Sequence, residues 1–412
     1  MTKTLRDLAA GGWRRPEVLL ILLAAAMPLS FQTWMALLNN FAIQRADFDG
    51  ADIGILQSLR EIPGFMSFAV VWILLLMREQ VLAYVSLLLL GLGTALTGFF
   101  PSMTGLLVTT FIMSTGFHYY ETVNQSLALQ WVSKDKAPET LGRMISARSA
   151  AGILTLGLIW GGVHFAGLDF AIVYVIGGMA TVAVAALAWF AWPSYAEDVV
   201  QHKHMVLRSR YWLYYLLTFF AGARRQIFVV FAGFLMVEKF GYDVSAITLL
   251  LLVNAVINTW AAPKIGRLIH RWGERKALVF EYVGLIGVFT AYAFVTDPWV
   301  AAGLYVVDHL FFAMAIAMKT YFQKIADPAD MASTAGVSFT INHIGAVFIP
   351  VLYGLLWLYS PALVFLSGAA MAGCSLLLSI NIPRDPRPGN EVILGPRMAP
   401  TPAPAGGAAA AE

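Results

Sequence analysis

Long apolar stretches alternate with short polar connections along the whole chain. Twelve of the stretches are long enough to cross a hydrocarbon core of about 30 Å, which takes about 20 helical residues. They lie at residues 18–43, 52–76, 81–100, 104–132, 141–166, 170–192, 209–238, 243–265, 276–296, 298–323, 331–358 and 361–382. A backbone in lipid must satisfy its own hydrogen bonds, and short alternating strands are lacking, so the pattern predicts twelve transmembrane helices rather than a barrel.

The composition agrees with this pattern. Hydrophobic residues make up 59% of the 412 residues and charged residues 12%, whereas soluble proteins carry about 25% charged residues. We therefore predict an all-α membrane protein. The first apolar stretch lacks the small-residue cleavage site of a signal peptide, so we interpret it as a helix that stays. The single cysteine, Cys374, gives no disulfide framework.

Lysine and arginine concentrate in every second connection, which places both termini in the cytoplasm. The domains predicted are a cytoplasmic N-terminus (1–17), an N-terminal six-helix bundle (18–192), a cytoplasmic linker (193–208), a C-terminal six-helix bundle (209–382) and a disordered cytoplasmic tail (383–412). The tail is rich in Pro, Ala and Gly, a composition that does not support a packed core.

The two halves of the chain repeat. A shift of 194 residues lays Phe48-Asp49 on Tyr242-Asp243, Gln32 on Gln226 and Gln130 on Lys324, without a gap. A constant register over so many segments indicates two parallel, pseudo-symmetric halves. Some transporters are built from such repeats and bind their substrate between them.

A loop motif supports this interpretation. Residues 266–276 read GRLIHRWGERK, which resembles the cytoplasmic loop signature G-x-L-x-D-R-x-G-R-K of the major facilitator superfamily. His270 stands where the signature has Asp, and Glu274 interrupts its last step. The resemblance implies the superfamily fold of two six-helix bundles. It also implies a gating role for the loop residues Gly266, Arg271, Gly273 and Arg275.

A second motif and one loop bear on the subfamily. Residues 157–162 read GLIWGG, similar to the antiporter motif G-P-x-x-G-G with Leu158 in place of Pro. The equivalent first-half loop, LLLMREQVL, has lost most of the loop signature. Neither feature identifies a substrate.

Polar residues inside the apolar stretches mark candidate functional positions. An ionisable side chain at the bilayer centre costs about 2.5–3.5 kcal/mol and normally faces an aqueous cavity or a partner. His118 and Glu121 are three residues apart and share one face of the fourth helix. We expect such residues from all helices to meet in one vestibule midway across the membrane.

The charges in these stretches are not balanced. Five cations (Arg60, Arg148, Arg224, Arg225 and Lys319) face three acids (Glu61, Glu121 and Asp308). A substrate anion would offset the surplus, and guanidinium groups suit carboxylate and phosphate oxygens. The predicted substrate-binding residues are Gln32, Arg60, Arg148, Arg224, Arg225, Asn254, Asn258, Lys319, Asn342 and His343.

Two alternatives remain open for the arginines. Arg60–Glu61 and Arg148–Glu121 can equally be structural ion pairs between or within helices. Arg224 and Arg225 point about 100° apart on a helix, so only one of them is expected to face the vestibule.

The predicted proton-coupling residues are Glu121, Asp308, His118 and Glu61. A carboxyl group or imidazole whose solvation changes as the protein opens and closes can load and release a proton in each cycle. Glu121 is the first choice, because no cation is adjacent to it in the sequence.

The sequence thus predicts a secondary active transporter that moves a small organic anion by alternating access, coupled to protons. We expect a monomer in the bacterial cytoplasmic (inner) membrane, with the lipid bilayer, protons and a small-molecule substrate as partners and no nucleic acid. Without a phosphate-binding loop, a His-Cys cluster or a Ser-His-Asp set, neither an enzyme, a cofactor nor a metal site is expected. An exporter of amphipathic or cationic compounds and a transporter-like receptor remain alternatives.

Overall fold

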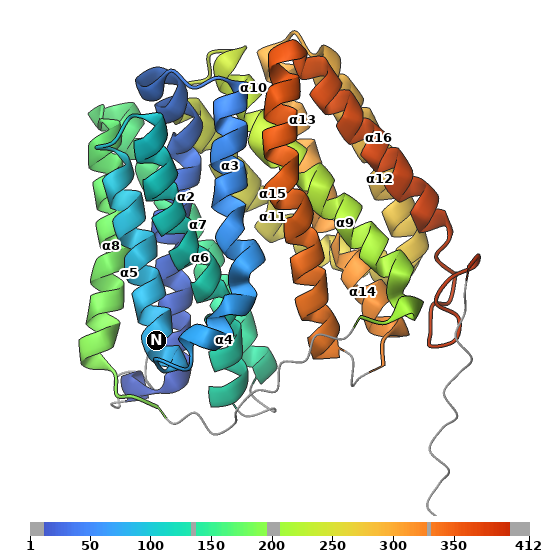
Figure 1. Ribbon diagram of the computed structural model, residues 1–412, viewed down its shortest axis with the longest axis horizontal. Coiled ribbons are helices and arrows are strands. Elements are labelled where there is room, and N and C mark those ends of the chain that lie inside the picture. Colours follow the sequence, from blue (N-terminus) through green and yellow to red (C-terminus); the bar gives the residue numbers. More distant parts are fainter. Residues whose placement is uncertain (1–11, 133–136, 196–206, 328–330, 396–412) are drawn as a thin grey trace, which may run out of the picture.

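The computed structural model of the protein describes residues 12–132, 137–195, 207–327 and 331–395. Within these ranges the chain is helical, and an isolated bridge between Arg387 and Asn390 is the nearest approach to a strand. The predicted all-α fold is confirmed for this part of the protein. Figure 1 shows the helices arranged as two bundles side by side.

The first bundle contains the helices of the first half of the chain. Its elements are η1 (Gly12–Arg14), α2 (Pro16–Ala46), α3 (Gly50–Phe65), η2 (Met66–Ala69), α4 (Val70–Ile73), α5 (Glu79–Thr97), α6 (Met103–Trp131), α7 (Ala137–Ala166) and α8 (Phe170–Ala191). The long helices among them, such as α2, α5 and α8, run between the upper and lower ends of the molecule in Figure 1.

The second bundle contains the helices of the second half. Its elements are η3 (Ser209–Tyr211), α9 (Trp212–Gln226), the π-helix η4 (Ile227–Ala232), α10 (Gly233–Glu238), α11 (Val244–Trp272), α12 (Glu274–Phe294), α13 (Pro298–Ala313), α14 (Ile316–Ile325), α15 (Met331–Tyr359) and α16 (Pro361–Ile380). The run α9–η4–α10 fills the seventh predicted stretch, and α13–α14 fills the tenth.

Ten helical runs of the described residues are long and apolar enough to span a membrane. Of the twelve predicted stretches, 52–76 and 104–132 are not among them. The first is broken into α3, η2 and α4, with Pro63 near the end of α3. The second is one helix, α6, but His118 and Glu121 lower its hydropathy.

Aspartates start equivalent helices in the two bundles. The Asp49 carboxylate accepts hydrogen bonds from the backbone N–H groups of Ala51 (2.8 Å) and Asp52 (3.0 Å) at the start of α3. The Asp243 carboxylate accepts one from Ala246 (2.7 Å) at the start of α11. Such caps satisfy donors that a helix leaves unpaired. The repeat read from the sequence therefore includes a shared structural role.

The two bundles meet at the upper end of the molecule. The closest contact is between α3 and α15, where a Cβ atom on Gly354 would lie 2.5 Å from the carbonyl oxygen of Gly50. The Ser58 hydroxyl of α3 accepts a hydrogen bond from the backbone N–H of Val351 on α15 (2.9 Å). The Asn40 amide of α2 donates to the carbonyl of Tyr242 (2.7 Å).

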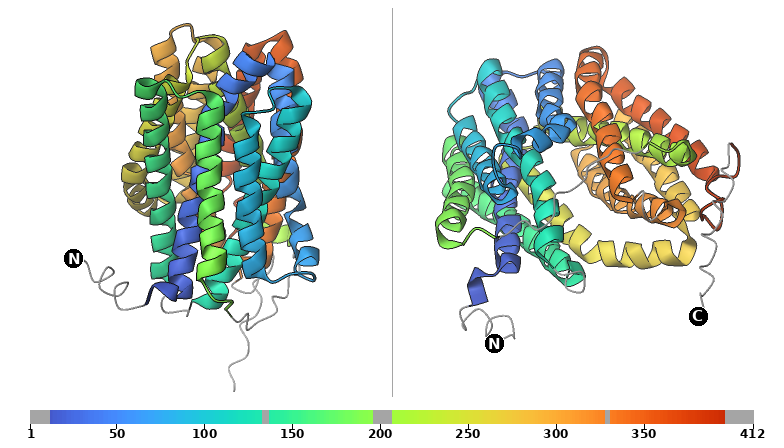
Figure 2. Two further views of the ribbon diagram at one scale, coloured as in Figure 1. Left: turned by 90° about the vertical axis from the view of Figure 1, so that its left-hand side faces the viewer. Right: turned by 60° about the horizontal axis from the view of Figure 1, so that its bottom comes forward.

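The bundles part toward the lower end. The ribbons diverge downward in Figure 1, and the view from below in Figure 2 shows the two bundles on either side of a central opening. We call this arrangement closed above and open below, which means that the helices of the two bundles touch at the upper end and that their ribbons lie farther apart at the lower end.

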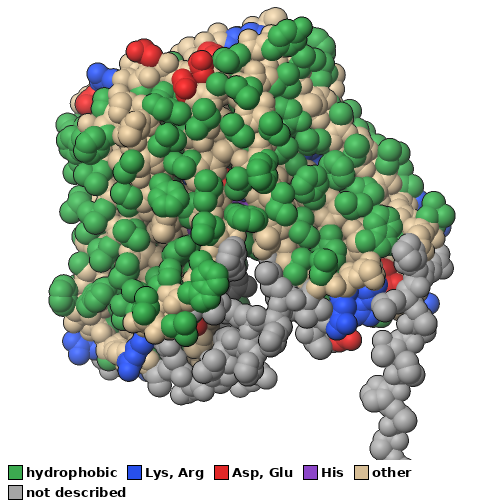
Figure 3. Space-filling model, viewed as in Figure 1, with side chains coloured by type: hydrophobic (Ala, Val, Ile, Leu, Met, Phe, Trp, Pro, Cys, Tyr) green, Lys and Arg blue, Asp and Glu red, His purple; other side chains and the backbone are tan. Residues whose placement is uncertain are grey.

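The outer surface is apolar over most of its height. In Figure 3 hydrophobic side chains cover the middle of the molecule, while Lys, Arg, Asp and Glu gather near its two ends. Large side chains such as Phe190 (87% exposed) and Leu76 (85%) lie on this surface. An apolar belt of this size requires lipid around it, so the protein is a multi-pass membrane protein.

One predicted boundary needs correction. Disorder was expected from residue 383 onward, but residues 383–395 pack against the second bundle. Val392 is fully buried, and the Tyr321 hydroxyl of α14 donates a hydrogen bond to the carbonyl of Glu391 (2.7 Å). Burial of the apolar Val392 side chain thus orders this segment despite its Pro- and Gly-rich composition. Residues 396–412 lie outside the described part of the chain.

Candidate functional site

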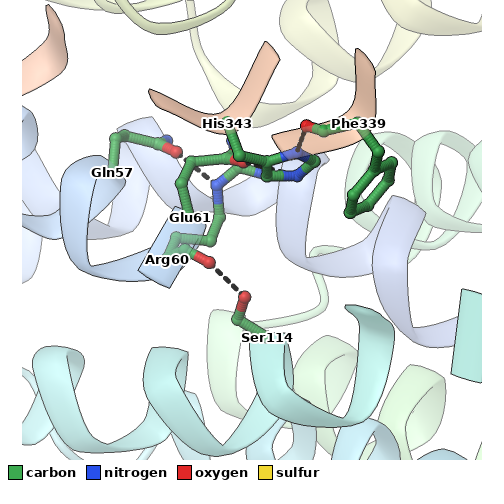
Figure 4. A network of polar contacts seen from close by, with 6 residues as sticks. All are labelled: Gln57, Arg60, Glu61, Ser114, Phe339 and His343. Atoms are coloured by element: carbon green, nitrogen blue, oxygen red, sulfur yellow. Dashed lines mark hydrogen bonds and ion pairs between the residues drawn. The ribbon is translucent and has the colours of Figure 1, made fainter. Parts of the chain in front are cut away.

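A buried ion pair lies on α3 where the two bundles face each other. The Arg60 guanidinium forms an ion pair with the adjacent Glu61, and both side chains are less than a tenth exposed. Arg60 Nε also donates to Gln57 Oε1 (2.7 Å), and the Ser114 hydroxyl of α6 donates to the Arg60 carbonyl (Figure 4). Several contacts therefore hold this pair in place.

Two histidines complete the group around Glu61. His343 comes from α15 of the other bundle; its Nδ1 lies 2.8 Å from the Phe339 carbonyl and its Nε2 lies 3.6 Å from Glu61 Oε2 (Figure 4). The His118 ring of α6 packs edge-on against the His343 ring, with centroids 5.3 Å apart. We call Arg60, Glu61, His118 and His343 the Glu61 cluster.

Gly64 makes room for this cluster. A Cβ atom on Gly64 would lie 2.5 Å from His343 Nε2 and 2.6 Å from His118 Cε1. His118 Nε2 is buried and has no hydrogen-bond partner among the described residues. The cluster therefore joins the two bundles through groups that can change their protonation.

The adjacent arginines of α9 lie in different surroundings. Arg225 is exposed, has no ion pair with a described residue, and its charge interacts with Glu61 and Arg60 across the bundle interface. Arg224 is 1% exposed and points into the second bundle. Of the two arginines, Arg225 is therefore the one whose charge reaches the first bundle, and it stays the candidate to face the vestibule.

Arg224 belongs to a second buried polar group. Its Nη2 lies 3.3 Å from Glu281 Oε1 on α12, and its Nη1 donates to the Ser375 hydroxyl of α16 (3.2 Å). Its guanidinium also lies over the Tyr282 ring, 5.0 Å from the centroid. This group ties α9, α12 and α16 together within the second bundle, so Arg224 has a structural environment.

Asp308 lies near this second group on α13. It is fully buried, and neither of its carboxylate oxygens has a hydrogen-bond partner among the described residues. Its charge interacts with those of Arg224 and Glu281. Sequence reasoning missed Glu281, although a glutamate inside the stretch 276–296 was a sufficient signal.

The remaining predicted acid of the first bundle, Glu121, is also paired. Glu121 on α6 forms an ion pair with Arg148 on α7, and about a third of each side chain is exposed. Three arginines predicted to bind substrate thus have carboxylate partners: Arg60, Arg148 and Arg224. The alternative of structural ion pairs left open by the sequence describes Arg60 and Arg148, and the pair of Arg224 with Glu281 adds a third.

Other predicted binding residues are spread over the helices. Gln32, Asn258 and Asn342 are partly buried, Asn254 is buried with both amide atoms lacking a described partner, and Lys319 is exposed on α14. The structure records no hydrogen bond between any of them and the Glu61 cluster within the described ranges. Whether they line one path with Arg225 stays a prediction.

The loop resembling the superfamily signature forms a sharp reversal. Gly273 has φ +78° between α11 and α12, a conformation that favours glycine. Glu274, which interrupts the signature, is buried and pairs with Lys324 Nζ of α14 (2.8 Å). In the first bundle Gln130 donates to Glu79 (3.0 Å). The Gln130–Lys324 correspondence therefore holds in three dimensions.

The other loop residues surround this reversal. Gly266 is partly buried near the end of α11, Arg271 is exposed and Arg275 is partly buried at the start of α12. Their gating role stays a prediction.

The Glu61 cluster also has a spacing that a metal ion could use. One ligand atom from each of Glu61, His118 and His343 lies within 4.8 Å of the others. Arg60 already occupies one Glu61 oxygen, and the charge of Arg225 reaches the same place. Two guanidinium groups oppose a divalent cation there, so we assign no metal.

The family follows from a comparison with known proteins. The family model described as Major Facilitator Superfamily matches residues 18–350 and 214–403, which together span nearly all of the chain. The chain belongs to the major facilitator superfamily. As a superfamily member it is a secondary transporter of a small molecule in a membrane, and it is not an enzyme.

Solved superfamily structures share its fold. A point mutant of the nucleoside transporter NupG superimposes with a TM-score of 0.74 at 15% identity, covering 89% of this chain and 99% of that one. A bacterial homologue of the human lysosomal transporter Spinster, inward-facing and occupied, gives 0.68 at 13% identity, covering 92% and 96%. No curated protein matches the sequence.

Proposed function

We propose that this superfamily transporter carries a small organic anion and that protons drive it. The observation that carries the proposal is Arg225, an exposed arginine between the two bundles with no acid paired to it among the described residues. A guanidinium in that position offers parallel N–H donors to a carboxylate or a phosphate group.

The charge surplus survives the structural pairing. Glu281 adds a fourth acid to Glu61, Glu121 and Asp308, which still leaves five cations against four acids. Of these five cations, Arg225 and Lys319 have no ion pair in the described ranges, and both are exposed. An anionic substrate would offset this excess on binding.

The conformation suggests which side of the membrane this state is open to. With both termini cytoplasmic, as the distribution of Lys and Arg predicts, the open lower end faces the cytoplasm and the closed upper end faces outward. The similarity to an inward-facing homologue of Spinster supports this orientation. The Glu61 cluster would then lie just beneath the closed end.

The first test concerns Arg225. Removing one hydrogen-bonded charge costs about 1.5–3 kcal/mol, so Arg225→Gln should raise KM for the transported anion about tenfold or more in proteoliposomes. Arg225→Lys, which keeps the charge, should fall between. Arg143→Gln is the control, because Arg143 pairs with Glu139 on the exposed surface.

Two results would count against the proposal. An unchanged KM for anions in Arg225→Gln would remove Arg225 as the anchor. Export of lipophilic cations that improves in Arg225→Gln would favour the cation exporter instead.

A further inference from the structure

We propose that Glu61 and His343 share one proton that holds the two bundles together at the closed end. The inference rests on the proposed function in one respect: it assumes that the protein alternates between a state closed above and a state open above. Glu61 belongs to α3 of the first bundle and His343 to α15 of the second. A proton bound between them would thus be bound by both bundles at once.

The donor and acceptor pattern of His343 requires this proton. His343 Nδ1 faces the Phe339 carbonyl, which can only accept, so Nδ1 carries a hydrogen. In a neutral imidazole Nε2 then has a lone pair, which faces Glu61 Oε2 at 3.6 Å. Two acceptors at that distance repel each other. One proton, on Nε2 or on the carboxyl group, turns the contact into an attraction.

The neighbouring groups do not occupy the space between Glu61 Oε2 and His343 Nε2, so a proton can bind there. Arg60 binds Oε1 of Glu61 and leaves Oε2 for His343. The other charged or titratable groups that face the pair are Arg225 from α9 and His118 from α6, and Trp34 of α2 lies under Arg60 at 5.8 Å. None of them places a second carboxylate at the pair.

The pair lies beside the seam that closes the molecule. Gly354 of α15 packs on Gly50 of α3, and Ser58 bonds Val351, all on the same two helices as the pair. Separating α3 from α15 at the upper end would pull His343 away from Glu61. The closed state should therefore bind one proton more than the state open above.

This difference in bound protons can be measured, because it makes the equilibrium between the two states depend on pH. When two states differ by one bound proton, their population ratio changes by up to about tenfold for each pH unit. Spin labels at Ile55→Cys on α3 and Leu352→Cys on α15 would report the separation, in a Cys374→Ser background. Ile55 (38% exposed) and Leu352 (58%) lie on the outer surface beside the seam, so labels fit there.

Pulsed electron–electron distance measurements from about pH 5.5 to about pH 8.5 bracket the usual pKa of histidine. In the wild-type background, we expect the ratio of the short-distance to the long-distance population to fall as pH rises, by up to about tenfold per pH unit. Glu61→Gln should keep the short distance at every pH, because its amide N–H donates to His343 Nε2 without a bound proton.

A second variant and a control separate the proton site from general effects. His343→Ala removes the shared site and should abolish the pH dependence. His309→Gln should keep the wild-type response, because His309 bonds the Tyr305 carbonyl on α13 and no contact with Glu61 is recorded in the described ranges. A pH-independent wild type, or an unchanged slope in His343→Ala, would overturn the inference. No substrate is added, so a protein with the expected slope that ignores anions would refute only the proposed cargo.

Discussion

At the scale of residues, the two adjacent arginines of α9 illustrate how helix geometry assigns roles. Their side chains are separated by a rotation of about 100° around the helix axis. Arg224 is enclosed by Glu281, Tyr282 and Ser375, while the charge of Arg225 reaches the first bundle. The same residue type thus holds a bundle together at one position and can meet a substrate at the next.

The Arg224–Glu281 pair permits a stability prediction. Removing one partner of a buried ion pair costs about 3–5 kcal/mol, because the other charge stays buried. Glu281→Gln should therefore lower the unfolding temperature of the detergent-purified protein by several degrees. Glu139→Gln, which breaks the exposed pair with Arg143, should change stability by less than about 1 kcal/mol.

An equal melting temperature for Glu281→Gln and the wild type would show that Arg224 finds another partner. A double variant, Arg224→Met with Glu281→Leu, should regain much of the lost stability, because apolar side chains can replace a buried pair.

Sequence reasoning named two ion pairs within the first bundle but not the contact that joins the two bundles. Arg60–Glu61 and Arg148–Glu121 were read as possible pairs from the sequence, and both pairs form. The contact between Glu61 and His343 joins residues 282 positions apart. It depends on how the two bundles meet, which no local pattern encodes.

At the scale of elements, the seam between α3 and α15 is built from glycine backbones. A Cβ atom at position 354 would lie 2.5 Å from the Gly50 carbonyl oxygen, so Gly354→Val should prevent the two helices from closing. We expect transport to fall below about a tenth of the wild-type rate, as a variant unable to complete the cycle should behave. The labels at positions 55 and 352 should also move apart.

Gly303→Val on α13 is the matched control, because no atom lies within 4 Å of the added Cβ position. Normal transport by Gly354→Val would mean that the seam can close in another way.

Element positions followed from the apolar pattern far better than element breaks. The stretch 209–238 was predicted as one helix, and it is one apolar run. Its π-helix, Ile227–Ala232, comes directly after Arg225 and Gln226. Periodicity at 3.6 residues per turn cannot reveal such a local widening, and π-helices are frequent at functional sites.

At the scale of the whole molecule, two bundles closed above and open below form one state of an alternating cycle. The proposed coupling predicts that an inwardly directed proton gradient, with the outside more acidic than the inside, increases anion uptake by wild-type proteoliposomes. Glu61→Gln should transport slowly and ignore the gradient. Glu121→Gln should still respond to the gradient, because the Glu121 carboxylate forms an ion pair with Arg148. Glu121 was the first choice for proton coupling because no cation is adjacent to it in the sequence, but Arg148 is its neighbour in the fold.

Loss of the gradient response in Glu121→Gln alone would return the coupling role to Glu121. Anion uptake that ignores the gradient in every protein, wild type included, would remove proton coupling altogether.

The segment after α16 has a practical consequence for anyone who purifies the protein. Val392 is fully buried and Glu391 is tied to Tyr321, so this segment closes part of the second bundle. Shortening the chain at Ile382 and fusing an affinity tag there would remove this segment and expose the apolar surface beneath it. A tag attached beyond residue 395 would leave it in place, and should give the higher yield of monodisperse protein.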